Sequence, residues 1–166
     1  MVMRNCFFSF HYAPDSWRAA MVRSIGVVDG EEAARDNDWE SVRRYDDKTI
    51  KNWIDQQMKG RTCAIVLIGE NTAGRPWINY EIETAWNNKL GLVGIHIHGL
   101  KNAQGMTASK GANPFTRFTI GQQQIPLTNV VRSYDPPGFD SRARYRYVAE
   151  NIGRWIEEGI AVRKQY

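Results

Sequence analysis

The sequence contains few cysteines and no long apolar segment. Only Cys6 and Cys63 occur among its 166 residues, and both fall in short apolar stretches, so we expect two buried, reduced thiols. No segment approaches the roughly 20 apolar residues that a membrane-spanning helix requires. The N-terminus, MVMRNCFFSF, lacks the small-residue cleavage site of a secretory signal. These absences predict a cytoplasmic protein without a membrane segment.

The chain also lacks a strong excess of charge of one sign. It has 22 Lys and Arg against 18 Asp and Glu, a net charge of +4 at pH 7. Because the basic residues are scattered along the chain, we expect no nucleic acid partner, whereas small anionic ligands such as nucleotides are compatible with this charge. The length favours a single domain over residues 1–166, and the hydrophobic share of 42% is ordinary for a globular protein.

Three common nucleotide and hydrolase motifs are missing. The sequence contains no GxGxxG after its first apolar stretch, no GxxxxGK[ST] and no GxSxG, which argues against Rossmann, P-loop and α/β-hydrolase sites. His96 and His98 form an H-x-H pair. Without a third ligand motif we expect them to be polar residues at a strand end and not a metal site. A catalytic triad that includes Ser9 and His11 stays an alternative, although the sequence identifies no acid that would orient the histidine.

The clearest pattern that is present is a buried strand followed by an amphipathic helix. Cys63–Ile68 is an unbroken apolar run, typical of a strand covered on both faces. Pro76 follows a polar connection and suits the first position of a helix. Glu81 borders the apolar stripe of this helix, and Glu83 points farther outward. The stripe consists of Ile78, Ile82, Ala85 and Trp86. Glu81 therefore follows the C-terminal end of a buried strand, where open α/β sheets bind their ligands.

The other predicted helices each have a cap or a stop signal. The first begins at Asp15 or Ser16, and the second begins after Asp46 and ends at Gly60. Gly91 is expected to stop the central helix, and a last helix is predicted over residues 141–158. The expected apolar faces are Trp17, Ala20, Met21 and Ser24 in the first helix, Ile50, Trp53, Ile54 and Met58 in the second, and Tyr145, Val148, Ile152, Trp155 and Ile156 in the last.

Strands that alternate with helices predict an α/β fold. We expect further strands over residues 6–10, 25–28, 92–97 and 127–131, which with the central strand make a five-stranded parallel sheet of the order 2-1-3-4-5. Two connections, 29–46 and 100–124, are long. The second is rich in polar residues and glycine, so we expect it to be mobile and to gate a site. Tyr80, opposite the buried stripe of its helix, weakly indicates self-association.

Five motifs together resemble the TIR-like family, in particular its branch in the bacterial Thoeris anti-phage systems. The resemblance covers roughly residues 4–115, with the motifs in family order. The motifs are FFSFHY (7–12), CAIVLIG (63–69), RPWINYEI (75–82), GIHIHG (94–99) and KGANPF (110–115). The resemblance implies a flavodoxin-like, doubly wound sheet of five parallel strands, which agrees with the strand–helix alternation.

The resemblance also implies an activity. Catalytic TIR domains cleave the nicotinamide–ribose bond of NAD with a helix glutamate, and Glu81 matches that position. The resemblance implies that NAD is the substrate, that no metal is needed, and that the product is a cyclic or modified ADP-ribose signal read by a separate effector. A homo-oligomer and a phage-derived activator are also implied. The residues expected to line the NAD site are Phe8, Ser9, His11, Trp39, Asn113 and Phe115.

Two other functions stay open at the level of the sequence. Some TIR domains are non-catalytic modules that assemble signalling complexes on the same fold, and fold alone does not prove chemistry. A nucleotide-binding or deoxyribosyltransferase-like protein is a third possibility. The presence of Glu81 at the matching position favours the enzyme, which we expect to act as an NAD glycohydrolase or an ADP-ribosyl cyclase.

Overall fold

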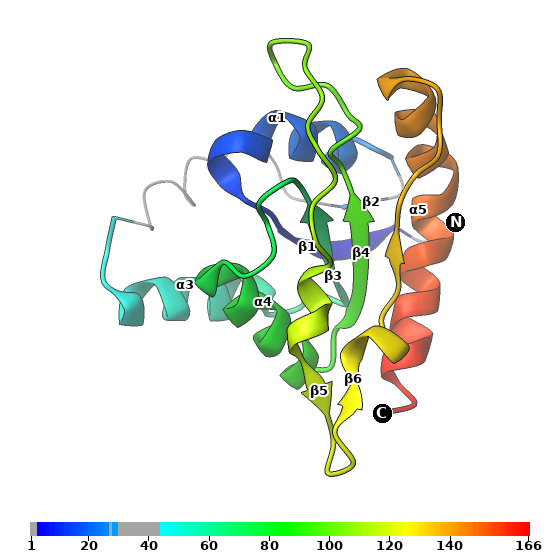
Figure 1. The fold of residues 1–166 in the computed structure, drawn as a ribbon. Coiled ribbons are helices and arrows are strands. Elements are labelled where there is room, and N and C mark those ends of the chain that lie inside the picture. The colour runs from blue at the N-terminus through cyan, green and yellow to red at the C-terminus, as the bar shows by residue number, and fades with distance from the viewer. Residues whose placement is uncertain (1–2, 27, 30–43) are drawn as a thin grey trace.

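The computed structural model describes residues 3–26, 28–29 and 44–166. Figure 1 shows a central sheet with helices packed on both of its faces. The elements, in chain order, are β1 (Arg4–Ser9), α1 (Tyr12–Arg23), β2 (Val28–Asp29), α3 (Asp47–Met58), β3 (Cys63–Ile68), α4 (Pro76–Asn87), β4 (Gly91–His96), η1 (Pro114–Arg117), β5 (Thr119–Ile120), β6 (Ile125–Pro126), η2 (Leu127–Asn129), β7 (Ser133–Tyr134) and α5 (Ser141–Arg163). The prediction of an α/β fold with a parallel sheet is confirmed.

Strand pairing places β3 at the centre of the main sheet. The strands lie in the order β2-β1-β3-β4-β7, and each neighbouring pair is parallel. The outer strands β2 and β7 contribute two residues each. A separate antiparallel hairpin, β5-β6, projects from one end of the molecule, and the connection after β4 projects from the other (Figure 1). The carboxyl ends of β1, β3 and β4 therefore meet at one edge of the sheet.

The two faces of the sheet are covered by different helices. On one face, α1 and α5 pack against alternate residues of β1, β3 and β4. On the other face, α3, α4 and the short helices η1 and η2 pack against the remaining residues. All six residues of β3 are buried, as the apolar run predicts for a strand covered on both sides.

Local signals set the ends of several helices as predicted. The Asp46 side chain accepts a hydrogen bond from the Thr49 amide at 2.8 Å and caps α3. Pro76 occupies the first turn of α4. Gly60, just beyond α3, has a φ of 76°, a conformation that glycine adopts without strain. The last helix is confirmed, and it extends five residues beyond residue 158, to Arg163.

The predicted buried face of the first helix is wrong. α1 begins at Tyr12, and it buries Asp15, Arg18, Ala19 and Val22. Trp17, which was expected in the core, is 56% exposed. The apolar periodicity misleads here because Asp15 and Arg18 are buried together as an ion pair of 2.9 Å, which offsets part of the cost of burying the two charges.

Two predicted boundaries are also wrong. The expected strand over residues 127–131 is the 3-10 helix η2 followed by a turn, and the edge strand is β7 instead. Leu127 and Val131 fill the core beneath η1, so their apolar character reflects packing and not a strand. Gly91 does not stop α4, which ends at Asn87. It is the first residue of β4, where a Cβ would come 2.7 Å from the Ile160 amide nitrogen.

The 100–124 connection projects from the molecule in its first half and is anchored to the core in its second half. Its Phe115 is fully buried in the core that α3 and α4 cover. The Ala108 amide donates to the carbonyl oxygen of His98 at 2.9 Å, and Lys110 pairs with Asp135 at 3.1 Å. A gating role for this segment stays a prediction.

The remaining expectations concern thiols, an outer aromatic residue and membrane segments. Cys6 and Cys63 are buried and not joined by a disulfide, as predicted. Tyr80 does not lie free on the outer face, because its hydroxyl donates to Asp55 of α3 at 2.8 Å. The weak argument for self-association from Tyr80 is therefore lost. In the part of the chain that the structure describes, no helix has the length and apolar character needed to cross a bilayer.

Candidate active site

Ser9 and Glu81 form the centre of the candidate site. Ser9 is the last residue of β1, and Glu81 lies in the second turn of α4. The Ser9 hydroxyl donates a hydrogen bond to Oε2 of Glu81. Each residue is only 1% exposed. The pair lies at the carboxyl end of the sheet, beside the point where the helices that follow β1 and β3 diverge to opposite faces, which is where α/β sheets bind ligands.

The second carboxyl oxygen of Glu81 has no partner among the described residues. Oε1 is buried, yet it accepts no hydrogen bond there. Burial raises the pKa of the Glu81 carboxyl to about 8, and the hydrogen bond from Ser9 acts in the opposite direction. A buried oxygen without a hydrogen bond destabilises a protein. Oε1 is therefore the acceptor of this pair that is not already engaged within the described part of the chain.

A cavity of about 140 Å³ lies beside this pair. Its walls include Phe10, which follows Ser9 along the chain, and Trp77 and Ile78, which precede Glu81 by four and three residues on the same side of α4. The complete lining is Phe10, His11, Tyr12, Arg75, Pro76, Trp77 and Ile78. The segment that follows β1 and the first turn of α4 thus form a pocket with aromatic walls, and Glu81 lies one turn farther along α4 than the residues that line it.

One wall of this cavity attracts anions. Arg75 is exposed and immediately precedes the first turn of α4, whose free N–H groups carry the positive end of the helix dipole. Glu81 lies more than one turn deeper along the same helix. The site therefore combines a positive rim, which suits phosphate groups, with a carboxyl group farther in, which suits a developing positive charge.

The structure places the predicted lining residues on both faces of the sheet. Ser9 and His11 lie at the candidate site, as the bond to Glu81 and the cavity lining show. The neighbouring Phe8 points to the opposite face and packs in the core with α1 and α5. The single hydroxyl proton of Ser9 is directed to Glu81, an arrangement that does not favour Ser9 as a nucleophile activated by His11.

The remaining predicted residues have other surroundings. The side chain of Asn113 accepts from the Phe115 amide at 2.9 Å and caps η1. The Phe115 ring is fully buried and packs over Gly94 of β4. Trp39, like most of the 29–46 connection, lies outside the described residues. Contact of these side chains with NAD stays a prediction.

Of the residues that line this cavity, only His11 was predicted from the sequence, and Arg75 and Trp77 are the most informative of those missed. Arg75 and Trp77 both belong to the RPWINYEI motif, but only its glutamate was assigned a role. For Trp77 the signal was available, because a residue four positions before Glu81 lies on its side of the helix. Arg75, six positions before Glu81, could be found only as the residue that precedes the helix. The Trp77 ring also packs edge-on against Tyr80, with 5.8 Å between ring centroids, which holds it at the cavity wall.

The His96–His98 pair is separate from this centre. The two rings meet edge-on with centroids 5.8 Å apart, and burial lowers the pKa of both imidazoles. Within residues 3–26, 28–29 and 44–166, no group of three or more His, Cys, Asp or Glu side chains is arranged to hold a metal ion. The pair lies at the end of β4, as predicted for polar residues at a strand end.

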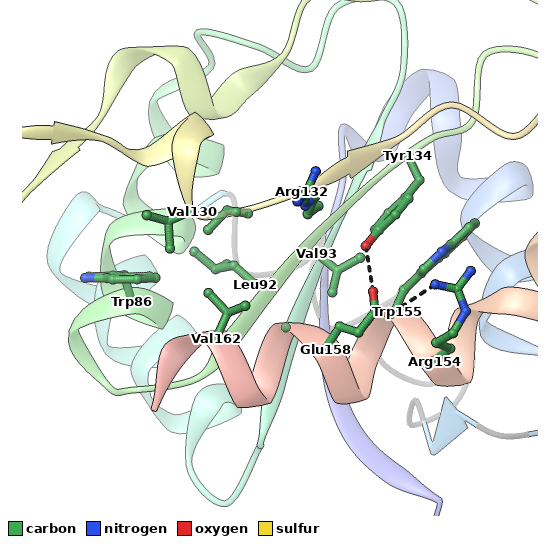
Figure 2. Close-up of a pocket in the computed structure, with 12 residues that line it drawn as sticks. Trp86, Leu92, Val93, Val130, Arg132, Tyr134, Arg154, Trp155, Glu158 and Val162 are labelled. Carbon is green, nitrogen blue, oxygen red and sulfur yellow. Dashed lines mark hydrogen bonds and ion pairs between the residues drawn. The ribbon is translucent and has the colours of Figure 1, made fainter. Parts of the chain in front are cut away.

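A larger cavity, of about 440 Å³, lies between α5 and residues 130–134 (Figure 2). Tyr134 stacks on Trp155 there at 4.2 Å, and Glu158 accepts hydrogen bonds from Tyr134 and Arg154 at 3.2 and 3.0 Å. Its apolar floor includes Leu92, Val93, Val130 and Val162. The cavity borders the amino-terminal half of β4, and its carboxylate is already satisfied. It therefore fits catalysis less well than the smaller cavity beside Glu81.

Comparison with known proteins agrees with the motifs. The family model described as "Thoeris protein ThsB, TIR-like domain" matches residues 7–102. A protein of Bacillus cereus (strain MSX-D12), named "Putative cyclic ADP-D-ribose synthase ThsB1", is 32% identical to this chain over 117 residues. The match covers 68% of this chain and 61% of that relative's length. The matched region contains the last three residues of β1 and all of β3 and α4, and therefore both members of the Ser9–Glu81 pair. The chain belongs to the TIR-like domain family of the Thoeris protein ThsB.

Proposed function

We propose that this chain is an NAD-consuming enzyme that cleaves the nicotinamide–ribose bond. The observation that carries the proposal is the buried Glu81, with one oxygen held by Ser9 and the other without a partner in the described part of the chain, beside a cavity with aromatic walls. The name of the Bacillus cereus relative supports the same chemistry. The shared region is 61% of that relative's length, so its activity is transferred here as a proposal.

The chemistry of NAD suits the residues present. Nicotinamide is bound to ribose as a cation, and cleavage of the bond leaves the electron pair on its nitrogen, so nicotinamide departs as a neutral molecule without an acid. The positive charge that remains on the ribose is oxocarbenium-like, and a preorganised carboxylate beside it stabilises the transition state. Glu81 supplies that carboxylate. Water or a nucleophilic atom of the ADP-ribose itself then captures the sugar carbon.

Two parts of the site suit two parts of NAD, its nicotinamide ring and its pyrophosphate. The partly exposed rings of Tyr12 and Trp77 in the cavity wall offer surfaces for stacking of a planar nicotinamide ring. Arg75 and the amino end of α4 offer positive charge for the pyrophosphate. The contacts assigned to Phe8, Trp39, Asn113 and Phe115 belong to this proposal as well, and no metal ion takes part in it. 

The biological role follows from the family. We infer that the product is a cyclic or modified ADP-ribose that serves as a signal in bacterial anti-phage defence and is read by a separate effector. We also infer a single domain over residues 1–166 with the flavodoxin-like strand order 2-1-3-4-5, self-association, and activation by a phage-derived trigger. These statements extend the family membership to the whole chain.

A non-catalytic assembly module is the alternative, and Glu81 argues against it. In a purely structural helix, a buried carboxyl with one unpartnered oxygen is less favourable than an apolar residue of similar size. An assembly module gains nothing from this arrangement, whereas an enzyme that meets a cationic substrate needs it. The alternative therefore leaves the most unusual side chain of α4 without a role.

The test is release of nicotinamide from NAD by the purified chain, measured by liquid chromatography together with the ADP-ribose products. Catalysis predicts free nicotinamide and an ADP-ribose product in equal amounts. The assay should be repeated with extract from phage-infected cells, which supplies a trigger. Absence of nicotinamide release under both conditions, from a folded protein, would favour the assembly module.

A further inference from the structure

The contact between Ser9 and Glu81 gives the two carboxyl oxygens different surroundings. Oε2 accepts the Ser9 proton, whereas Oε1 has no partner in the described part of the chain. Ser9 is one of the few polar residues in the buried sheet, at 1% exposure. Its side chain is therefore not exposed to solvent. Its hydroxyl proton is used in the hydrogen bond to Glu81.

We propose that Ser9 is a positioning residue, whose hydroxyl holds Glu81 with Oε1 directed to the reacting sugar and favours the charged form of the carboxyl. The inference rests on the proposed function, because it assigns a role within the same site. It also changes the role of Ser9 from a residue that lines the NAD site to one that acts through Glu81.

Both partners of this hydrogen bond are held by rigid elements. Ser9 pairs with Val66 in the parallel register of β1 and β3, so its backbone is fixed at the end of the sheet. Serine has one side-chain torsion before its hydroxyl oxygen, which leaves that oxygen little freedom once the backbone is fixed. Glu81 lies in the interior of α4, between Ile78 and Ile82 of its buried face. A hydrogen bond between two such elements fixes the orientation of the carboxyl group.

The hydroxyl is also the group that opposes the cost of burying the charge. Burial raises the pKa of Glu81, and the described residues place no ion pair on its carboxyl group. The charged or titratable side chains that line the neighbouring cavity are His11 and Arg75, and Glu83 is exposed on the outer side of α4. Donation from Ser9 to the carboxylate stabilises its charged form.

The first experiment follows the pH dependence of kcat/KM for NAD cleavage in the parent and in Ser9→Ala. Loss of a hydrogen bond to a charged group corresponds to a pKa shift of about one to two units. We expect the midpoint of the profile to move upward by that amount, so that the rate near pH 7 falls roughly tenfold or more and recovers at high pH. Ser9→Thr, which keeps the hydroxyl, should restore most of the parent profile.

Thr72→Val is the matched control. Thr72 is another buried hydroxyl at the same end of the sheet, and its Oγ1 accepts from the Gly69 amide at 2.8 Å without touching Glu81. This variant should lose stability but keep the parent pH midpoint. An equal shift of the midpoint in both variants, or an unmoved midpoint in Ser9→Ala, would overturn the positioning role.

A second measurement does not depend on catalysis. The free energy of unfolding is compared across pH for the parent, Ser9→Ala, Glu81→Gln and the double variant. Because the folded-state pKa of Glu81 lies above the unfolded one, stability falls as pH rises between the two values. Ser9→Ala should extend this fall to higher pH, and the extension should vanish in the Glu81→Gln background. If NAD is not cleaved but the extension is seen, only the proposed function fails. If the extension is absent, the role of Ser9 fails.

Discussion

The Arg18 guanidinium reaches from α1 to the carbonyl oxygen of Leu100, which accepts a hydrogen bond from Nε at 2.8 Å. The same side chain donates from Nη2 to the Met106 carbonyl oxygen at 3.0 Å and pairs with Asp15 at 2.9 Å. Arg18 is only 3% exposed. One buried side chain thus fastens the beginning of the connection that follows β4 to the helix that follows β1.

Arg18→Met should therefore destabilise the protein strongly. The substitution leaves Asp15 buried without its counter-charge and removes the donor from three backbone carbonyl groups, those of Pro14, Leu100 and Met106. We expect a loss of about 3 kcal/mol or more in the free energy of unfolding. Chemical denaturation measures the loss. Arg142→Met, at an exposed position of α5, is the control and should change stability by less than about 0.5 kcal/mol. Equal stability of the two variants would show that the buried pair contributes little.

The catalytic assignment is tested by exchanging one oxygen for an amide nitrogen. Glu81→Gln keeps the size of the side chain and removes its negative charge, so nicotinamide release should fall on the order of 100-fold or more. Glu83→Gln makes the same change two residues farther along α4, on its exposed side, and should keep most of the activity. Full activity in Glu81→Gln, or equal losses in both variants, would mean that the catalytic carboxylate is elsewhere.

Glu81 should also make the stability of the protein depend on pH. Its folded-state pKa is about 8, above the value of roughly 4.3 for an unfolded chain. The folded protein holds the proton more tightly, so stability decreases as pH rises from about 5 to about 8 and then levels off. Glu81→Gln has no titratable carboxyl at this position, so this pH-dependent contribution to stability is absent from the variant. The stability of the variant relative to the parent should increase by up to about 1.4 kcal/mol per pH unit in that window.

The measurement is denaturation of both proteins at several pH values. Burial raises the pKa of Asp15 as well, but that contribution is common to parent and variant and cancels in the difference. A difference that stays constant between pH 5 and 8 would contradict the assignment of a buried, partly neutral Glu81. A difference of the opposite sign would contradict it more strongly, since it would mean that the folded state favours the charged carboxylate.

Asn113 offers a test that separates a structural role from contact with NAD. Its side chain accepts from the Phe115 amide and caps η1, so Asn113→Ala should lower the free energy of unfolding by about 1 kcal/mol. Asn113→Asp keeps the accepting oxygen and should retain the stability. If Asn113 contacts NAD as proposed, the aspartate variant is stable but turns over NAD more slowly. Parent-like turnover in Asn113→Asp would limit Asn113 to capping.

The unit from Cys63 to Trp86 could be predicted from the sequence because its signals are local. An unbroken apolar run marks a strand covered on both faces, and Pro76 followed by a 3.6-residue period marks the start and buried side of a helix. Glu81 could be singled out for the same reason, since its place beside the stripe depends only on helix geometry. The structure differs from the prediction in one respect: Glu81 is fully buried, whereas the sequence placed it at the border of the apolar stripe.

Predictions from apolar periodicity were wrong in two places. In one, the buried residues are charged, and in the other, the apolar residues do not form a strand. In α1, the ion pair of Asp15 and Arg18 occupies the buried side, and a pattern that equates charge with solvent assigns the wrong face. At residues 127–131, a short apolar run serves a 3-10 turn whose Leu127 amide bonds to the Phe118 carbonyl oxygen at 2.9 Å. Both arrangements depend on contacts with residues that are distant in the sequence, and a local pattern contains no information about those contacts.

The sequence by itself determined the α/β class, the central strand and helix, and the carboxyl group on which the proposed chemistry depends. Only the tertiary structure decided which oxygen of that carboxyl group accepts a hydrogen bond from Ser9. Ser9 and Glu81 are 72 residues apart in the chain, and they meet because β1 pairs beside β3 while α4 packs beneath both strands. A hydrogen bond requires its two heavy atoms to lie within about 3 Å. That precision between distant segments arises from packing, and residue order alone does not specify it.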